Sequence, residues 1–220
     1  MPSQSVQDYL KQAYKLQSEG NDKVSLSELA ERLKVSAPSV TQMVKKLEKD
    51  GLITYTPYHG IVLTEKGKKI ALEVIRHHRL LELFLSEIIG FPLEKVDAEA
   101  EKLEHAISEE FEDTISDRLD NPKIDPHGDP IPTKDGKLPV YQYLPLTEVS
   151  LGEVVVIKRI SDHDPEMVRY MKDLGLLPHV RLRVLSKEPF EGPLKVHLND
   201  REIVVGDRIA KSIFVAPVEN

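Results

Sequence analysis

The chain has 220 residues, of which 40% are hydrophobic, and it contains no cysteine. A chain of this length can bury more than one hydrophobic core, so we expect several domains. The lack of cysteine excludes disulfides, thiolate zinc sites and iron–sulfur clusters. No apolar run approaches the roughly 18 residues that a membrane span needs, and the N-terminus lacks the pattern of a signal peptide, so we expect a cytoplasmic protein with no membrane partner.

The net charge of −7 is distributed unevenly. Residues 1–70 carry 11 Lys and Arg against 8 Asp and Glu, whereas residues 71–144 carry 8 against 17. The N-terminal third is therefore mildly basic, as a nucleic-acid-binding segment would be, and the middle third is strongly acidic. Bound divalent cations would offset part of the repulsion among those acidic residues.

Three helices are predicted in the first fifty residues. Residues 4–19 have the apolar spacing of an amphipathic helix, and Ser25-Leu-Ser-Glu28 resembles a capping box that opens a second helix. A third helix is predicted between the cap at Ser36-Ala-Pro38-Ser39 and the stop at Asp50-Gly51. Two short helices joined by a tight turn indicate a helix-turn-helix.

A β-hairpin is predicted next, because residues 52–56 and 60–64 flank the turn Pro57-Tyr-His-Gly60, and it would make this domain winged. In such domains the N-terminal part of the second helix of the pair meets base edges and phosphates. The alternative is that these polar residues only cap and solvate an ordinary helix. The residues that we expect to contact DNA are Ser36, Pro38, Ser39, Thr41, Gln42, Lys45, Lys46 and His59.

The acidic middle of the chain predicts two long helices, from residue 65 to about 89 and over residues 94–119. His78 and Glu82 would lie one turn apart on the first of these helices. On the second, an i, i+4, i+7, i+8 spacing would place Asp97, Glu101, Glu104 and His105 on one face. Carboxylates and imidazoles gathered on one face indicate a site for a divalent cation, although the alternative is a solvated helix face with no ligand.

An apolar stripe runs beside this acidic face and predicts a packing surface, which would serve a homodimer. Its members are Val96, Ala100, Leu103, Ile107 and Phe111. Residues 121–145, rich in Pro and Gly, predict a linker with little regular structure and a domain boundary. Beyond the linker we expect a small β-barrel with one helix near residues 166–174 and strands at 154–157, 180–185, 194–198, 202–205 and 213–215.

Six stretches make the chain resemble the diphtheria-toxin-repressor family of iron- and manganese-dependent transcription regulators, nearly from end to end. They are Asp8-Tyr-Leu-Lys-Gln-Ala-Tyr14, Val40-Thr-Gln-Met-Val-Lys-Lys-Leu-Glu-Lys-Asp-Gly51-Leu52, Leu63-Thr-Glu-Lys-Gly67, His78-Arg-Leu-Leu-Glu82, Glu101-Lys-Leu-Glu104-His105 and Pro126-His-Gly-Asp-Pro-Ile-Pro132. The resemblance implies a mainly α fold. Its expected domains are a winged helix-turn-helix DNA-binding domain at 1–70, a helical dimerisation and metal-binding domain at 71–140 and an SH3-like β-barrel at 146–220.

The resemblance also implies the ligands of two metal sites. Matched position by position, the primary site consists of Asp8, Glu101, Glu104 and His105. The ancillary site falls on His78 and Glu82, with Asp97 where iron-sensing members tend to have a His, and Asp164 is expected as a ligand from the barrel helix region. We expect no ligand role for His77, His127, His163, His179 and His197.

The donor types favour manganese. Iron-type members carry Met and Cys where this chain has Asp8 and Glu101, and replacing sulfur by carboxylate favours the harder Mn²⁺. Fe²⁺ is the second candidate, and Zn²⁺ or Co²⁺ could substitute in vitro. Lys11 is a departure, because the short manganese-type members carry a Glu there that helps to hold a second ion. The resemblance therefore does not imply a paired-metal site.

The function implied is that of a homodimeric transcriptional repressor that controls metal-ion homeostasis, binds double-stranded operator DNA when its metal corepressor is bound, and has no enzymatic activity. One alternative is a winged-helix regulator that does not respond to metal. Another is a metal-dependent hydrolase, since His and carboxylate clusters can activate water. No nucleophile motif or Gly-rich phosphate loop supports the hydrolase.

Overall fold

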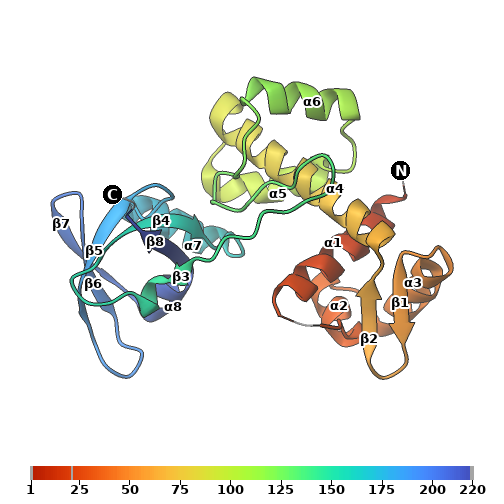
Figure 1. The fold of residues 1–220 in the computed structure, drawn as a ribbon, viewed down its shortest axis with the longest axis horizontal. Coiled ribbons are helices and arrows are strands. Elements are labelled where there is room, and N and C mark those ends of the chain that lie inside the picture. Colours follow the sequence, from red (N-terminus) through yellow and green to blue (C-terminus); the bar gives the residue numbers. More distant parts are fainter. Residues whose placement is uncertain (1, 21, 219–220) are drawn as a thin grey trace. The chain divides into compact units, whose positions relative to one another are not determined.

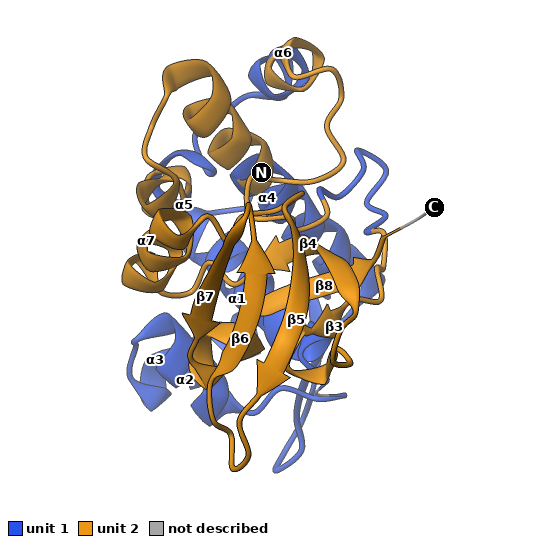
Figure 2. Cartoon of the chain, turned by 90° about the vertical axis from the view of Figure 1, so that its left-hand side faces the viewer, with its two compact units in different colours: residues 1–78, 101–114, 131–138 blue, residues 79–100, 115–130, 139–220 orange. Residues whose placement is uncertain are grey.

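The structure, a computed structural model, describes residues 2–20 and 22–218. Its helices and strands are labelled in Figure 1. The chain forms two compact units that alternate along the sequence, and Figure 2 colours them. The first unit comprises residues 1–78, 101–114 and 131–138, and the second comprises residues 79–100, 115–130 and 139–220. Within the described residues, no helix is both long and apolar enough to cross a membrane.

The first unit contains the predicted winged helix-turn-helix. Its elements are α1 (Gln4–Ser18), α2 (Leu26–Leu33), α3 (Ala37–Lys49), β1 (Ile53–Thr56) and β2 (Gly60–Leu63). The capping box is present, since the Ser25 hydroxyl accepts from the Glu28 N–H while the Glu28 carboxylate accepts from the Ser25 N–H. Apolar side chains of all three helices and the hairpin, such as Leu10, Leu29 and Ile61, form one core. This core holds α1 against the helix pair that carries the predicted DNA contacts.

Of the two long helices predicted for the middle of the chain, the first is present and the second is interrupted. The first is α4 (Glu65–Leu83), which continues as a π-helical segment, η1 (Phe84–Ile89). The second prediction is wrong in one respect, because residues 94–119 contain two helices, α5 (Leu93–Leu103) and α6 (Glu109–Arg118). Ser108 starts the second one, with its hydroxyl accepting a hydrogen bond from the Phe111 N–H. Glu104 and His105 therefore lie in a turn, and they do not share a helix face with Asp97.

This break also divides the predicted apolar stripe. Val96 and Ala100 are buried, whereas Leu103 and Phe111 are 36% and 43% exposed. The stripe is therefore not one continuous face of one helix.

Residues 121–143 contain no helix and no sheet strand, as predicted, but their first part is packed firmly. Asp125 and His127 are buried, and the Ile160 N–H donates to the His127 carbonyl at 2.9 Å. Gly128 has a φ of +95°, and a Cβ there would lie 2.0 Å from the Lys158 carbonyl oxygen. Only glycine lets this loop lie so close to the strand that follows, β4 (Val154–Ile160).

The C-terminal part of the second unit is a six-stranded antiparallel sheet in the order β3-β8-β4-β5-β6-β7. The strands around β4 are β3 (Leu144–Pro145), β5 (Arg181–Lys187), β6 (Leu194–Leu198), β7 (Arg201–Val205) and β8 (Ile213–Pro217). The helices of this part are η2 (Leu146–Glu148), α7 (Pro165–Leu174) and α8 (Asp207–Lys211). The five predicted strands and the predicted helix are present, but the sheet is open and not closed into a barrel. Its edge strands β3 and β7 do not pair with each other, and β3 has only two residues.

Candidate metal centre

Three predicted ligands come together in the first unit. Asp8 lies on α1, and Glu104 and His105 lie in the turn between α5 and α6. Nε2 of His105 lies 2.8 Å from Oδ1 of Asp8 and 3.2 Å from Oε1 of Glu104. One helix and one turn, separated by about ninety residues of sequence, thus supply a compact set of oxygen and nitrogen donors.

Two of these donor atoms, Asp8 Oδ1 and His105 Nε2, are buried and have no hydrogen-bond partner among the described residues. The other ring nitrogen of His105, Nδ1, lies 2.6 Å from Oε1 of Gln7. Since an amide oxygen only accepts, Nδ1 donates its proton to Gln7, which leaves Nε2 as the ring nitrogen that faces the Asp8 carboxylate. A ring nitrogen and a carboxylate oxygen this close need a positive charge beside them, and these buried donors fit a divalent metal ion.

Glu101 and His78 lie on the other side of Glu104. Nδ1 of His78 lies 2.6 Å from Oε2 of Glu104, and His78, Glu101 and Glu104 form a second set of converging donors. The fully buried Lys11 reaches this set from α1. Its ammonium donates to Oε2 of Glu101 at 2.7 Å and to Oε1 of Glu104.

The charges in this cluster shift the pKa values of its members in different directions. Burial raises the pKa of Asp8, and the nearby His105 and Lys11 offset only part of that rise. Burial also acts to raise the pKa of Glu104, but the hydrogen bond from His78 and the charge of Lys11 outweigh it, so that pKa is lowered. For Lys11, burial lowers the pKa, and the charges of Glu104 and Glu101 outweigh burial and raise it. Metal binding would therefore compete with a proton chiefly at Asp8.

His77 supports the turn that carries Glu104. It is buried, with Nδ1 3.1 Å from the Glu104 carbonyl oxygen and Nε2 3.1 Å from Oε2 of Glu112. Arg76 donates to the same Glu112 carboxylate and to the Pro132 carbonyl oxygen. Burial acts to raise the pKa of Glu112, but His77 and Arg76 lower it to about 2. We call Arg76, His77 and Glu112 the brace of the turn.

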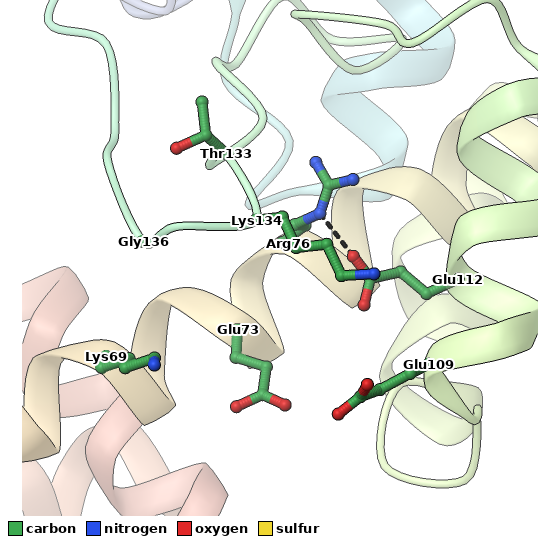
Figure 3. Close-up of a pocket in the computed structure, with 8 residues that line it drawn as sticks. All are labelled: Lys69, Glu73, Arg76, Glu109, Glu112, Thr133, Lys134 and Gly136. Carbon is green, nitrogen blue, oxygen red and sulfur yellow. Dashed lines mark hydrogen bonds and ion pairs between the residues drawn. The ribbon is translucent and has the colours of Figure 1, made fainter.

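A pocket of about 230 Å³ adjoins this brace. In Figure 3 the Arg76–Glu112 pair forms one side of it, and the carboxylates of Glu73 and Glu109 point into the same space. Lys69 and Lys134 also line it, so its charges are mixed and select neither anions nor cations by sign alone.

The second unit holds a donor set that the sequence analysis missed. Glu82 on α4, His127 in the loop and Asp162 after β4 bring their ligand atoms together. Nδ1 of His127 lies 3.5 Å from Oε1 of Glu82 and, within the described residues, has no hydrogen-bond partner. Helical spacing could not reveal this set, because its members come from three separate segments. The available signal was the turn motif Asp125-Pro-His-Gly-Asp129.

Asp125 shapes the loop that presents His127. Its Oδ1 accepts from the backbone N–H groups of His127 and Asp129, both at 2.9 Å. Burial and the neighbouring Glu82 raise the pKa of Asp125 to about 8. Burial lowers the pKa of His127, but its interactions with Glu82 outweigh burial and raise it to about 9. Without a metal ion, His127 therefore holds a proton that a cation would displace.

Three family profiles match almost the whole chain. They are the iron dependent repressor N-terminal DNA binding domain over residues 1–61, the iron dependent repressor metal binding and dimerisation domain over 64–133, and the FeoA domain over 144–217. The iron-dependent repressor IdeR of Mycobacterium leprae is 36% identical over 188 residues, which cover 80% of this chain and 81% of that protein. The chain belongs to the iron-dependent repressor family.

Further relatives of this repressor-family chain span its full length. The diphtheria toxin repressor of Corynebacterium glutamicum is 31% identical over 222 residues, covering 96% of this chain and 95% of that protein. A solved manganese-dependent transcriptional repressor in complex with manganese has a TM-score of 0.90 and 38% identity, covering 97% and 100% of the two chains. The structure of ScaR with bound Zn²⁺ has a TM-score of 0.78 and 33% identity, covering 99% and 100%.

The residues of this family member that we expect to contact DNA are all exposed. The predicted contact residues of α3 and its cap are all exposed, and His59 is exposed in the turn between β1 and β2. Val40, Val44 and Leu47 point into the core. Ser36 also caps α3, with its hydroxyl accepting from the Ser39 N–H at 3.4 Å. Ser36 therefore caps α3 and is still exposed, so its capping role does not exclude a contact with DNA.

Two predicted ligands of this repressor-family chain, Asp164 and Asp97, belong to none of the donor sets described above. Asp164 caps α7, accepting from the Glu166 N–H at 3.0 Å, and it pairs with Arg208 at 3.1 Å. The residue that joins Glu82 and His127 is Asp162, two positions earlier. His78 is the last residue of the first unit, whereas Asp97 belongs to the second. The ancillary site with Asp97 remains a prediction.

Proposed function

We propose that the chain is a homodimeric repressor that binds operator DNA when a divalent metal ion, Mn²⁺ in preference to Fe²⁺, occupies the cluster around Asp8 and His105. The observation that carries the proposal is the pair of buried, unpartnered donor atoms, Asp8 Oδ1 and His105 Nε2, at 2.8 Å. Full-length similarity to a manganese-dependent repressor supports it. We further propose a cytoplasmic location, no enzymatic activity and a role in metal-ion homeostasis.

The ligands that we assign to the primary ion are Asp8, Glu104 and His105, with Glu101 as a fourth. Three carboxylates and one imidazole suit Mn²⁺ better than softer ions. Zn²⁺ or Co²⁺ would bind the same atoms in vitro, since affinity for such sites follows ligand type and the general metal order. The ion would supply the positive charge that these facing donors lack.

The residues themselves would then couple metal binding to DNA binding. Asp8 lies on α1, whose apolar face packs in the same core as α2 and α3. Holding Asp8 against His105 would restrict α1 and, through that core, the orientation of α3. A dimer needs its recognition helices about 34 Å apart to bind DNA. A narrower range of α3 orientations therefore raises the fraction of dimers with that spacing. Coupling of about 1–3 kcal/mol would raise DNA affinity about 5- to 150-fold.

The second unit supports a further proposed site. We assign Glu82, His127 and Asp162 to a second divalent ion, because the buried His127 Nδ1 has no partner in the described part of the chain. The ancillary ligands His78, Glu82 and Asp97, and Asp164, stay proposals that rest on the family resemblance. So do the domains at 1–70, 71–140 and 146–220, whose limits lie close to those of the three profile matches.

The test is a fluorescence-anisotropy titration of selected operator DNA with chelator-treated full-length protein, with and without Mn²⁺, at fixed salt. We expect tight binding only with metal, and we expect Asp8→Ala to remove the metal dependence. Asp22→Ala, a change at an exposed carboxylate, is the control. DNA binding that ignores metal would favour the alternative of a metal-independent winged-helix regulator.

A further inference from the structure

The outward face of the C-terminal sheet carries a cluster of basic side chains. Residues of β5 alternate between buried and exposed, so Leu182 and Val184 point into the core. Arg181 and Arg183 alternate with them and point outward. Strand β5 contains three Lys or Arg residues and β6 and β7 contain one each, against a single acidic residue, Glu202. This part of a chain with a net charge of −7 is therefore locally basic.

A hollow of about 420 Å³ lies on this face of the sheet. Arg181 and Arg183 line it from β5, and Val154 and Leu185 add apolar side chains to its wall. Arg183 lies opposite Val154 of β4 on one side and opposite His197 of β6 on the other, so the hollow crosses three paired strands (Figure 2). The rest of the lining consists of Leu182, His197, Asn199 and Glu202.

The protein does not neutralise the two arginines of the hollow. Within the described residues, neither the Arg181 nor the Arg183 guanidinium has an ion pair or a side-chain hydrogen bond. Glu202, the one carboxylate in the lining, pairs with Lys195 at 3.0 Å, so the two charges of that pair offset each other. The pocket beside the brace has charges of both signs, whereas this hollow keeps an excess of positive charge. It therefore selects anions.

Charge and shape favour a phosphate monoester among the possible anions. Positions i and i+2 of a strand lie roughly 6.6 Å apart on one face, so Arg181 and Arg183 can reach the same anion. A monoester carries a charge of about −1.5 to −2 at pH 7 and three acceptor oxygens, which match two guanidinium groups with several donors each. A carboxylate, or a phosphate diester of a nucleic-acid backbone, carries only a single charge.

The apolar part of the lining indicates that the phosphate belongs to an organic molecule. Val154 is 37% exposed, and Leu185 lies two positions after Arg183 on the same strand. Small-molecule sites combine such apolar walls with a few polar groups that fix the orientation of the ligand. An inorganic ion would leave these apolar side chains in contact with water.

We propose that the outward face of the C-terminal sheet binds an organic phosphate monoester, with the phosphate between Arg181 and Arg183 and the organic group over Val154 and Leu185. None of these residues belongs to the sets proposed for metal or DNA binding. The inference therefore goes beyond the proposed function and does not depend on it. It gives the repressor a second kind of ligand.

The experiment is a calorimetric titration of chelator-treated full-length protein with phenyl phosphate, benzoate and inorganic phosphate at fixed salt. The first two probes share a ring and differ in the anion, and the third lacks the ring, so we expect phenyl phosphate to bind most tightly. Arg181→Gln and Arg183→Gln should each weaken its binding about 10- to 100-fold, because each removes a charged hydrogen-bond donor. Arg169→Gln, at an exposed position on α7, is the matched control and should bind like the wild type.

Phenyl phosphate binding that both variants leave unchanged, or no binding at all, would overturn the proposal. Benzoate or inorganic phosphate that binds as tightly as phenyl phosphate would also contradict it, because the hollow would then not distinguish the monoester. A titration with operator DNA separates the monoester from a nucleic-acid backbone. We expect the two variants to keep the salt dependence of the wild type. A slope of log affinity against log salt that falls by about one in each variant would assign these arginines to DNA phosphates instead.

Discussion

The side-chain oxygen of Gln7 accepts a hydrogen bond from Nδ1 of His105, and this contact decides which ring nitrogen faces Asp8. Gln7 and His105 come from elements that are far apart in sequence. Gln7 is buried on α1 and directly precedes Asp8. A neutral amide fixes the imidazole without adding a charge to the cluster. Gln7 is therefore a positioning residue that the sequence analysis did not identify.

Gln7→Leu should weaken Mn²⁺ binding about 10- to 100-fold, as is usual when the partner of a metal-bound histidine is lost. The leucine has similar size but cannot accept a hydrogen bond, so His105 would be free to place its proton on either nitrogen. Calorimetric titration with Mn²⁺ measures the effect. Gln4→Leu, at an exposed position on the same helix, is the control, and equal affinities for the two variants would refute the role of Gln7.

Glu112 should make the metal-free protein lose stability in acid. Its pKa is about 2 in the folded protein and 4.5 in its ordinary state, so the unfolded chain binds more protons between these values. The contribution of Glu112 is complete above pH 4.5 and is lost as the pH falls toward 2. Glu112→Gln should flatten this part of the stability–pH curve and lower stability at neutral pH by about 1.5–3 kcal/mol. Urea unfolding at several pH values measures both effects, and Glu109→Gln, at an exposed site, should leave the slope unchanged.

His127→Ala should remove one bound ion per chain without removing the ion at Asp8 and His105. Its Nδ1 is the only imidazole donor in the set with Glu82 and Asp162, and a carboxylate pair alone holds Mn²⁺ more weakly. Equilibrium dialysis followed by metal counting tests this, with His197→Ala, exposed on β6, for comparison. If His127→Ala binds as many ions as the comparison variant, the second site is not at His127.

Gly128→Ala should destabilise the second unit by more than about 1 kcal/mol, because it combines an unfavourable φ with a collision against the Lys158 carbonyl. Gly152→Ala is a matched control. Gly152 also has a positive φ, of +79°, but a Cβ there meets no atom within 4 Å. Both variants place alanine at a positive φ, so the difference between their melting temperatures measures the effect of the collision alone. Equal melting temperatures would show that the close approach of the loop contributes nothing.

Local signals predicted the first unit well. The capping box at Ser25, the cap at Ser36 before Pro38, and the hairpin turn each act over a few residues, and each is found in the structure. The turn between α5 and α6 was missed because the apolar spacing continues through Leu103 and Ile107, while the interrupting signal is a single hydroxyl at Ser108.

The candidate site was predictable in part. Sequence spacing pointed to residues from the acidic helices, and the family resemblance added Asp8, which no helical period could connect with Glu104. The set of Glu82, His127 and Asp162 depends on tertiary contacts between three segments, including the approach that Gly128 permits. The burial of Lys11 could not be read from its sequence position, since lysine is normally a surface residue.

The open C-terminal sheet leaves two borders where backbone groups could recruit a strand from another molecule. At one edge, β3 is too short to pair well with a further strand, because it has only two residues and one of them is a proline without an N–H. The other is guarded by charge, because β7 begins with Arg201 and Glu202, and Glu202 pairs with Lys195 of β6 at 3.0 Å. The short β3 and the charged β7 thus protect the open sheet against edge-to-edge aggregation. Neutralising Arg201 and Glu202 would make such aggregation easier.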